Sequence, residues 1–446
     1  HGGGGGPGWR PALVGRRLAR LVNDGPALLR KAAPRERRRF ERAIGAHLRF
    51  LWARWRAAPD PLGRIEAAVG LLLGELATAR RTRRMRRAAA AVGRAAAEMV
   101  RIDGGTDSRN PEALGRAFAL LAWAAHALGE AEMEPDARHA AALKRAGPAL
   151  RALRLGDGGL ARFHGGGAMA DGTLDQAFAL AGAAGRGTRR DAAMGFVRMQ
   201  AGGVALVIDA APPPQGPEGA ASPLAFEMSV GPRRLIVGVG PGGGLGGDWP
   251  VAARATAAHS AVEVAGVSAA RLARPGFASR VLGRPLVSGP SIVSAERADD
   301  EAGQWLLAEH DGYAARFGLF VARRLNVAPS GAVVSGEDTL TAPTVAARER
   351  FDAAAEDGGV PFVIRFHAHP DIGVERARDG RGARLTAEAG PAWLFRAAGG
   401  AVAVEDSVWL DGPGRAPRTS RQIVVSARAE AYFGRVSWTL HPDEAG

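Results

Sequence analysis

The feature that most constrains the fold is a change in the spacing of apolar residues near Asp191. Before it, apolar side chains recur every three or four residues, which is typical of amphipathic helices. After it, short runs of β-branched and aromatic residues are separated by Gly, Pro and Asp, which is typical of antiparallel strands. This order of patterns predicts an α+β protein, with an α-helical domain followed by an antiparallel β-sandwich.

The helical part divides at Pro and Gly residues into successive segments. Predicted helices run from Pro34 to a break at Pro59, and over 65–76, 85–99, 111–128 and 136–153. The helix after Pro111 has a well-formed start, with Asn110 as N-cap and Glu112 in the first turn. Because the links are short, consecutive helices are expected to be antiparallel neighbours.

Glycines crowd the chain between the two patterns, and this indicates a domain junction, a binding loop, or both. We therefore divide the chain into a helical domain (1–154), a Gly-rich junction (155–192) and a β domain (193–446). Within the β domain, Leu224–Val230 alternates apolar and polar residues and is predicted to be a half-buried strand, whereas 235–237 is predicted to be buried on both faces. Further strands are predicted at 204–208, 317–322, 360–367, 401–409, 423–426 and 436–440.

The composition of the chain limits the classes of protein to which it can belong. The chain has 446 residues, 46% hydrophobic, no cysteine and a net charge of +14. The positive charge is almost all arginine, concentrated before residue 200 in runs such as RRTRRMRR from Arg80. Such a run is either a solvated helix face or a surface that attracts a polyanion. Nucleic acid is disfavoured as the partner, because aromatic residues are not interleaved with the basic ones.

No apolar run approaches the roughly 20 residues that span a bilayer, so no transmembrane segment is expected. The chain begins at His1 with HGGGGG, without Met or a signal peptide, and is interpreted as a fragment or a processed chain. A periplasmic or cell-envelope location is favoured over a cytoplasmic one. The sequence leaves the oligomeric state open.

The most chemically suggestive stretch runs from Arg254 to Ser260, where Arg254 and His259 are expected to lie close together at a strand entry. The structural alternative is a hydrogen-bonded histidine at a strand edge. Downstream, HDGY places His310 beside Tyr313, which could act as an acid or simply pack over a turn. His367 and His369 share one face of a predicted strand, either as its polar face or as a metal pair.

Beyond these patterns, the sequence resembles the heparinase II/III-like family, related to bacterial polysaccharide lyases that act on uronates. The resemblance runs from about Gly15 to Leu440, in matching order. It is carried by LAFEMSVGPRRLIVGVG and RATAAHSAV, with DGGTDSRNPEAL, GDGGLARFHGGG, VALVIDAAPPP, HDGYAARFGL, GEDTL, FVIRFHAHP and RQIVV.

This resemblance implies an incomplete α/α toroid before the β-sandwich and a lyase that cleaves an acidic polysaccharide by β-elimination. Elimination at a uronate needs a group that neutralises the carboxylate, a base and an acid. We expect the catalytic groups to be His259, Arg254 and either Tyr313 or His310. The expected substrate-binding residues are Arg109, as a bidentate partner of a carboxylate, with Asn110, His164 and Trp249.

The sequence also departs from the family pattern. Metal-bearing members have a His and an Asp before the strand at 224–230, and an Asp at the end of the next strand. This chain has Ala220, Ser222 and Gly238 there, so no metal or other cofactor is expected. Its helical part has no tyrosine, and Thr106 replaces a histidine. A protein that kept the fold for carbohydrate binding or envelope-polysaccharide maturation is therefore the alternative.

Overall fold

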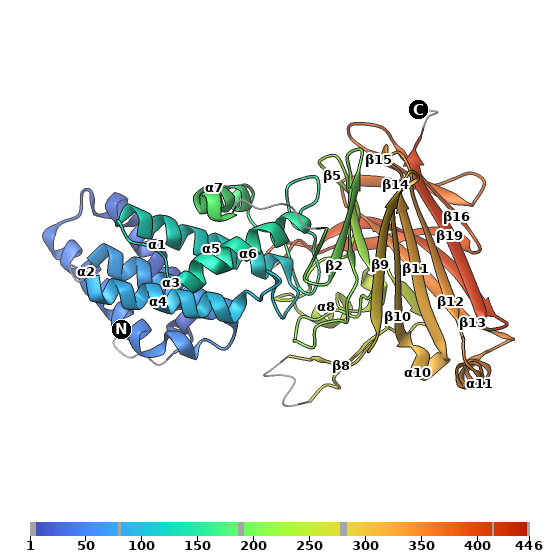
Figure 1. The fold of residues 1–446 in the computed structure, drawn as a ribbon, viewed down its shortest axis with the longest axis horizontal. Helices are drawn as coiled ribbons and strands as arrows, with labels where there is room; N and C mark the ends of the chain where they lie inside the picture. Colours follow the sequence, from blue (N-terminus) through green and yellow to red (C-terminus); the bar gives the residue numbers. More distant parts are fainter. Residues whose placement is uncertain (1–5, 79–81, 186–190, 277–282, 413, 444–446) are drawn as a thin grey trace. The chain divides into compact units, whose positions relative to one another are not determined.

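The computed structural model describes residues 6–78, 82–185, 191–276, 283–412 and 414–443 (Figure 1). The arginines at 80 and 81, with which the basic run begins, and the first glycines lie outside these residues. The chain forms two compact units. The helical unit comprises His1–Asp107, Glu112–Arg151 and Met169–Arg190, and the β unit comprises Ser108–Pro111, Ala152–Ala168 and Asp191–Gly446. A helical region followed by antiparallel strands confirms the predicted fold class.

The long helices all precede the strands (Figure 1). They are α1 (Pro11–Leu29), α2 (Pro34–Arg54), α3 (Pro61–Thr78), α4 (Thr82–Met99), α5 (Pro111–Glu130), α6 (Ala137–Ala152) and α7 (Thr173–Gly185). Proline at the first position starts several of them, because its fixed φ suits a helix and its missing N–H is not needed there. In the described ranges, no helix combines the length and the apolar character needed to cross a bilayer.

Two helices, α1 and α7, were not predicted. Helix α1 carries Gly15, Gly25 and Pro26, which weaken the helical pattern. A Cβ on Gly15 would lie 2.2 Å from the carbonyl oxygen of Glu66 in α3, so the missing side chain is what lets these two helices approach closely. Helix α7 lies in the Gly-rich region, and the ring of Phe178 packs 4.9 Å from that of Phe118 in α5.

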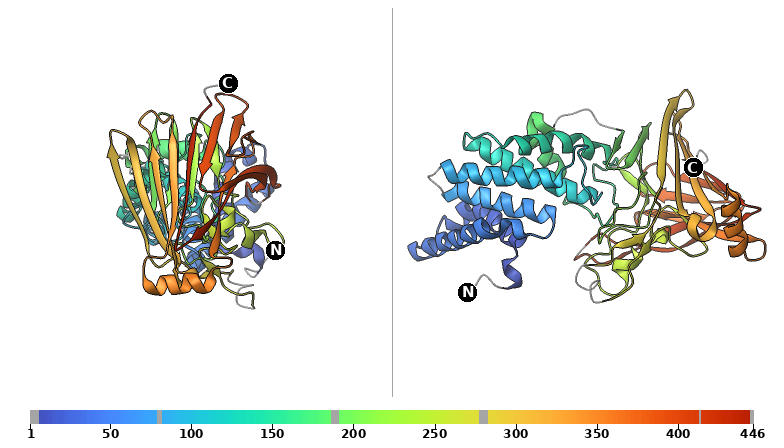
Figure 2. Two further views of the ribbon diagram at one scale, coloured as in Figure 1. Left: turned by 90° about the vertical axis from the view of Figure 1, so that its right-hand side faces the viewer. Right: turned by 60° about the horizontal axis from the view of Figure 1, so that its bottom comes forward.

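Antiparallel pairing arranges most of the strands into two layers (Figures 1 and 2). The first layer runs β1–β2–β3–β4–β5–β13–β18–β17, and β6 pairs with β13 beside β5. Its strands are β1 (Ala192–Ala193), β2 (Phe196–Ala201), β3 (Val204–Asp209), β4 (Phe226–Val230), β5 (Arg233–Val237), β6 (Val262–Val264), β13 (Gly359–Ala368), β17 (Ala401–Trp409) and β18 (Arg418–Glu430).

The second layer runs β9–β10–β11–β12–β19–β16–β15–β14. Its strands are β9 (Val293–Asp300), β10 (Gly303–Tyr313), β11 (Leu319–Val327), β12 (Val334–Thr341), β14 (Ile372–Arg376), β15 (Gly382–Ala387), β16 (Trp393–Ala398) and β19 (Phe433–Pro442). The layers meet at the tight β18–β19 turn, where Glu430 pairs with Phe433. Short helices α8 (Trp249–Ala252), α10 (Ala314–Phe317) and α11 (Val345–Ala354) and a small β7 (Arg271–Leu272)–β8 (Leu286–Ser288) hairpin complete the unit.

The core of the β unit lies between these layers. Phe226 and Phe366 of the first layer pack against Trp438 of the second, with ring centroids 5.6 and 5.1 Å from the indole. Phe395 of β16 extends the cluster, 5.0 Å from Phe366. All of these rings are buried, and burying such large aromatic surfaces is a major source of stability.

The prediction that the strand around β4 is half-buried was wrong, because both of its faces are covered. Its apolar face points into the core, while Glu227 and Ser229 on the other face are also buried. The backbone N–H of Arg162 donates to Glu227 at 3.0 Å, and that of Gly156 donates to Ser229 Oγ at 2.8 Å. The Gly-rich loop of residues 156–162 therefore lies over the polar face of β4.

Candidate functional site: a polar pocket in the β unit

The Gly-rich loop and the segments around β4 and β5 enclose a narrow pocket whose free volume is about 10 Å³, room for about one water molecule. Its lining residues come from 162–166, 218–220, 240–243 and 250–259, all within the β unit. His259 and Arg254 both line it, so the structure brings this expected pair together. Arg162 and Glu218 line it as well.

His259 is held in place through its neighbour Ser260. Ser260 Oγ accepts from the N–H of Phe226 at 2.9 Å and donates to the carbonyl of the same residue at 2.5 Å. Arg323 of β11, a buried cation paired with Asp338, also donates to the Ser260 carbonyl at 2.5 Å. The backbone next to His259 is thus held by both layers of the β unit.

The environment of His259 keeps its ring neutral. Burial, followed by the nearby His367 and His164, lowers its pKa to about 3. Among the described residues, Nε2 has no hydrogen-bond partner. A neutral imidazole with an unused nitrogen at a pocket wall can accept a proton or a hydrogen bond from a ligand.

Two arginines bring donors to the same pocket. Arg254 donates from Nε to the carbonyl of Gly219 at 2.7 Å and from Nη1 to that of Arg284 at 2.6 Å. Its Nη2 is buried without a hydrogen-bond partner in the described chain, as is Nε of Arg162. The Arg162 guanidinium stacks 4.3 Å from the Trp409 ring, and its Nη1 lies 3.0 Å from Asp411 Oδ1. An anionic ligand is the natural partner for such unused donors.

Behind the pocket lies a buried charge cluster of Arg109, His164 and Asp209. Asp209, at the end of β3, is fully buried and accepts from Arg109 Nη2, while its Oδ2 lies 3.2 Å from His164 Nε2. The N–H of Ala220 donates to His164 Nδ1 at 3.2 Å, which places the proton of a neutral ring on Nε2, facing Asp209. Burial disfavours the carboxylate, yet Arg109 and His164 hold the pKa of Asp209 below its ordinary value.

The prediction that Arg109 binds a substrate carboxylate needs correction, because its guanidinium is already fully engaged. Besides Asp209, it donates to the carbonyls of Met194 (2.7 Å), Gly195 (3.1 Å), Ala211 (3.1 Å) and Pro212 (2.9 Å). These bonds use all of its N–H donors. Arg109 therefore ties the segment before α5 to the ends of β1 and β3.

Of the other three expected substrate-binding residues, only one lines the pocket. His164 lines the pocket and is completely buried. Asn110 does not line it, and its Nδ2 donates to the His164 carbonyl at 3.1 Å, which supports the loop. Trp249 begins α8 and is 36% exposed; its neighbour Pro250 lines the pocket, whereas its own ring does not.

The expected acids, Tyr313 and His310, lie in the core of the β unit and do not line this pocket. The Tyr313 hydroxyl donates to the Val262 carbonyl at 2.7 Å, and burial raises its pKa far above the ordinary range. His310 Nδ1 accepts from the N–H of Gly312 at 3.0 Å, and burial lowers its pKa to about 3. The turn-packing alternative therefore describes Tyr313 better.

Two pocket residues, Arg162 and Glu218, were not singled out from the sequence, and neither was Asp209 behind the pocket. Arg162 and Asp209 sit inside motifs that carried the family resemblance, GDGGLARFHGGG and VALVIDAAPPP. A charged residue at the end of an otherwise apolar strand was the available signal for Asp209, because burial of such a carboxylate requires partners. Glu218, in a Pro/Gly loop, carried no signal.

The donors around His259 do not fit a structural or catalytic zinc. Ala220 and Gly238 offer no ligand atom, and a Cβ on Gly238 would lie 2.9 Å from His259 Nδ1. Asp209 is already paired with Arg109. No group of three or more His, Cys, Asp or Glu side chains in the described ranges is arranged to hold a metal. Zinc prefers about four such ligands.

We accordingly expect purified protein to carry no stoichiometric zinc at His259. Elemental analysis after dialysis against a weak chelator checks this, with His259→Ala as the matched variant. About one zinc per chain in the wild type, lost in the variant, would contradict the expectation.

Acidification is expected to destabilise the β unit. Burial holds the pKa values of His259 and His310 at about 3 and that of His367 at about 4, whereas the unfolded residues titrate near pH 6.5. Below pH 6.5 the unfolded chain binds protons that the folded chain excludes, so stability is full above that pH and is lost as it falls towards 4. The slope is about 1.4 kcal/mol per pH unit for each excluded proton. Urea unfolding at pH 7, 6, 5 and 4 tests this, and unchanged stability from pH 7 to 5 would refute it.

Comparison with known proteins gives two kinds of sequence match. A family model described as heparinase II/III-like, C-terminal, matches residues 184–439. FtsZ-localized protein C of Caulobacter vibrioides (strain NA1000 / CB15N) is 34% identical over 355 residues, which are 77% of this chain and 58% of that protein. The chain thus spans less than two thirds of this curated relative.

Solved structures with a similar fold include a heparan sulfate lyase and a heparinase III gene product. A heparan sulfate lyase HepC mutant from Pedobacter heparinus matches 97% of this chain and 68% of its own, with a TM-score of 0.69 and 13% identity. A heparinase III gene product matches 98% and 68%, with a TM-score of 0.72 and 12% identity. At such identities the likeness establishes the fold alone.

Proposed function

Because the chain belongs to the heparinase II/III-like family, we propose that it cleaves a uronate-containing acidic polysaccharide by β-elimination at the His259 pocket. The supporting observation is the pocket itself: Arg162 and Arg254, each with a buried donor that has no partner in the described chain, line it together with a neutral His259 ring. A pocket with cationic donors and a proton acceptor suits a sugar carboxylate next to an acidic carbon.

In this proposal, Arg162 and Arg254 neutralise the uronate carboxylate, which makes the proton on the adjacent carbon removable. His259 Nε2 accepts that proton, the bond between the neighbouring carbon and the glycosidic oxygen breaks, and a carbon–carbon double bond forms. The leaving oxygen must then receive a proton. The His259 imidazolium can return the proton it has just taken, and its lowered pKa favours this return. The same lowered pKa makes the first proton transfer the demanding step, which neutralisation of the carboxylate by Arg162 and Arg254 must assist.

The experiment is incubation of the full chain with a panel of uronate polysaccharides, followed by ultraviolet absorbance of the unsaturated product. A neutral glucan that lacks the carboxylate is the control substrate and should give no signal. Absorbance that rises with a uronate polymer and with enzyme concentration supports the lyase. No product from any uronate polymer would overturn it.

Two observations favour a second candidate, a protein that binds envelope polysaccharide without cleaving it. Tyr313 is buried with its hydroxyl bonded to the backbone, and the helical part has no tyrosine. In addition, the curated relative is named for its localisation with FtsZ rather than for catalysis. Under this alternative we propose a location with FtsZ at the cell envelope. A fluorescent fusion imaged together with FtsZ tests it, and a diffuse signal would count against it.

A further inference from the structure

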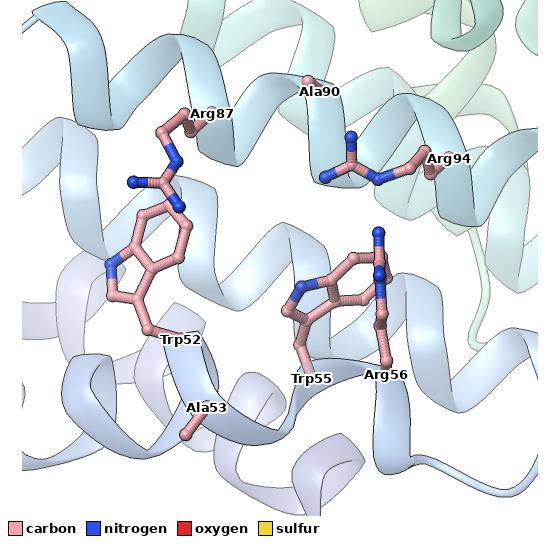
Figure 3. Close-up of a pocket in the computed structure, with 7 residues that line it drawn as sticks. All are labelled: Trp52, Ala53, Trp55, Arg56, Arg87, Ala90 and Arg94. Atoms are coloured by element: carbon pink, nitrogen blue, oxygen red, sulfur yellow. The ribbon is translucent and has the colours of Figure 1, made fainter.

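The helical unit contains a second pocket, of about 530 Å³, between the end of α2 and the middle of α4 (Figure 3). Its lining is almost entirely tryptophan and arginine: Trp52, Ala53, Trp55, Arg56, Arg87, Ala90 and Arg94. The expectation that aromatic residues are not interleaved with basic ones was therefore wrong at this place. No carboxylate lines the pocket. All of these residues belong to the helical unit, so the pocket is separate from the one at His259.

The two indoles are fixed in place and orient the guanidinium groups. Trp52 Nε1 donates to the buried Glu75 at 2.6 Å, and Trp55 is buried. The Arg87 guanidinium lies 5.2 Å from the Trp52 ring centre. Those of Arg56 and Arg94 lie 5.1 and 5.8 Å from the Trp55 ring centre. Figure 3 shows both side chains beside this indole. These are cation–π distances, so the rings hold the cations without neutralising them.

The donors of these arginines are left for a ligand. In the part of the chain that the structure describes, Arg56 and Arg87 make no hydrogen bond or ion pair beyond their contacts with the indoles. Nε of Arg94 is buried without a hydrogen-bond partner there. The cations here repel one another: burial, then Arg56 and Arg138, lower the pKa of Arg94 more than the nearby Asp136 and Glu98 raise it. A ligand that carries more than one negative group relieves both the repulsion and the unsatisfied donor.

We propose that this pocket binds an acidic oligosaccharide, through its carboxylate or sulfate groups, as an accessory site on the helical unit. The inference rests on the proposed action on acidic polysaccharide. Nucleic-acid bases are the less suitable ligand, because they need a free aromatic face for stacking and guanidinium groups already lie over both indoles. The pocket therefore presents N–H donors, which recognise anionic groups, rather than bare rings.

The test compares binding of a heparin hexasaccharide by the full chain and by two double variants. Arg56→Ala with Arg87→Ala removes two exposed, unpaired cations of the pocket. Arg83→Ala with Arg86→Ala removes the same charge from exposed positions of α4 that do not line it. We expect the first pair to raise Kd at least ~10-fold, since two charge-assisted hydrogen bonds are lost, and the second to raise it less than ~2-fold. Circular dichroism checks that both variants are folded.

Three results would overturn the proposal: no binding by the wild type, an equal loss in both double variants, or tighter binding of a single-stranded oligonucleotide that the first pair abolishes. The last would identify a nucleic-acid site. Failure here is separable from failure of the lyase proposal, because binding is measured directly. Cleavage with unchanged binding in the Arg56/Arg87 variant rejects only the accessory site, whereas specific binding without cleavage by any uronate polymer rejects only the lyase.

Discussion

Replacing Asp209 by alanine is expected to lower the free energy of unfolding of the β unit by about 3–5 kcal/mol. The carboxylate is fully buried between Arg109 and His164, so its removal leaves a buried guanidinium without its counter-charge. Urea unfolding of the full chain measures the loss, and hydrogen exchange of the β2–β4 amides assigns it to the β unit.

The matched control is Asp406→Ala, which breaks an ion pair with Arg421 on the surface. Its carboxylate is 91% exposed, so the expected change is no more than about 1 kcal/mol. Combining Asp209→Ala with Arg109→Met should cost less than the sum of the single changes, because the two residues interact directly. A loss below about 1 kcal/mol for Asp209→Ala would mean that the cluster is not a structural centre.

The second large effect is on catalysis. If the chain is a lyase, His259→Ala should reduce kcat by at least ~10²-fold while the protein remains folded. Because the pKa of His259 is about 3, the neutral base is present at all pH values well above that, and its titration should not reduce the rate between pH 5 and 8. The measurements are the rate of unsaturated product formation across this range and the urea midpoint of the variant.

His310→Gln is the control for this prediction. His310 is as buried as His259 but lies outside the pocket, so its change should affect stability and leave kcat nearly unaltered. The reverse result, with kcat lost only on changing His310, would move the chemistry to the HDGY turn. Activity that survives His259→Ala would place the base elsewhere.

The sequence predicted the elements better than the contacts made by their polar residues. Helices α2–α6 followed from apolar spacing, and β17 was predicted at its observed bounds, Ala401–Trp409. The polar face of β4 was predicted to be exposed to solvent, but it is buried. Alternation of apolar and polar residues shows that one face of a strand is polar, and it does not show whether another segment covers that face. The cover comes from residues 156–162, more than 60 positions earlier in the chain.

Contacts between residues far apart in the sequence also limited the prediction of the site. The pairing of His259 with Arg254 could be predicted because the two residues are near neighbours in sequence. The engagement of Arg109 could not, since its partners lie some 85 to 103 residues later. Tyr313 was equally ambiguous, because only the fold decides whether its hydroxyl meets a ligand or the Val262 carbonyl.

The position of β13 in the first layer has a consequence for synthesis on the ribosome. This strand pairs with β5 through His367 and Val237, and with β6 through Ile364 and Val262. Both partners leave the ribosome about a hundred residues earlier, an interval on the order of ten seconds. Until then the edges of β5 and β6 are unpaired and open to association with other chains. A nascent chain halted before residue 359 contains every residue that lines the His259 pocket. It lacks β13, the strand that pairs with both β5 and β6.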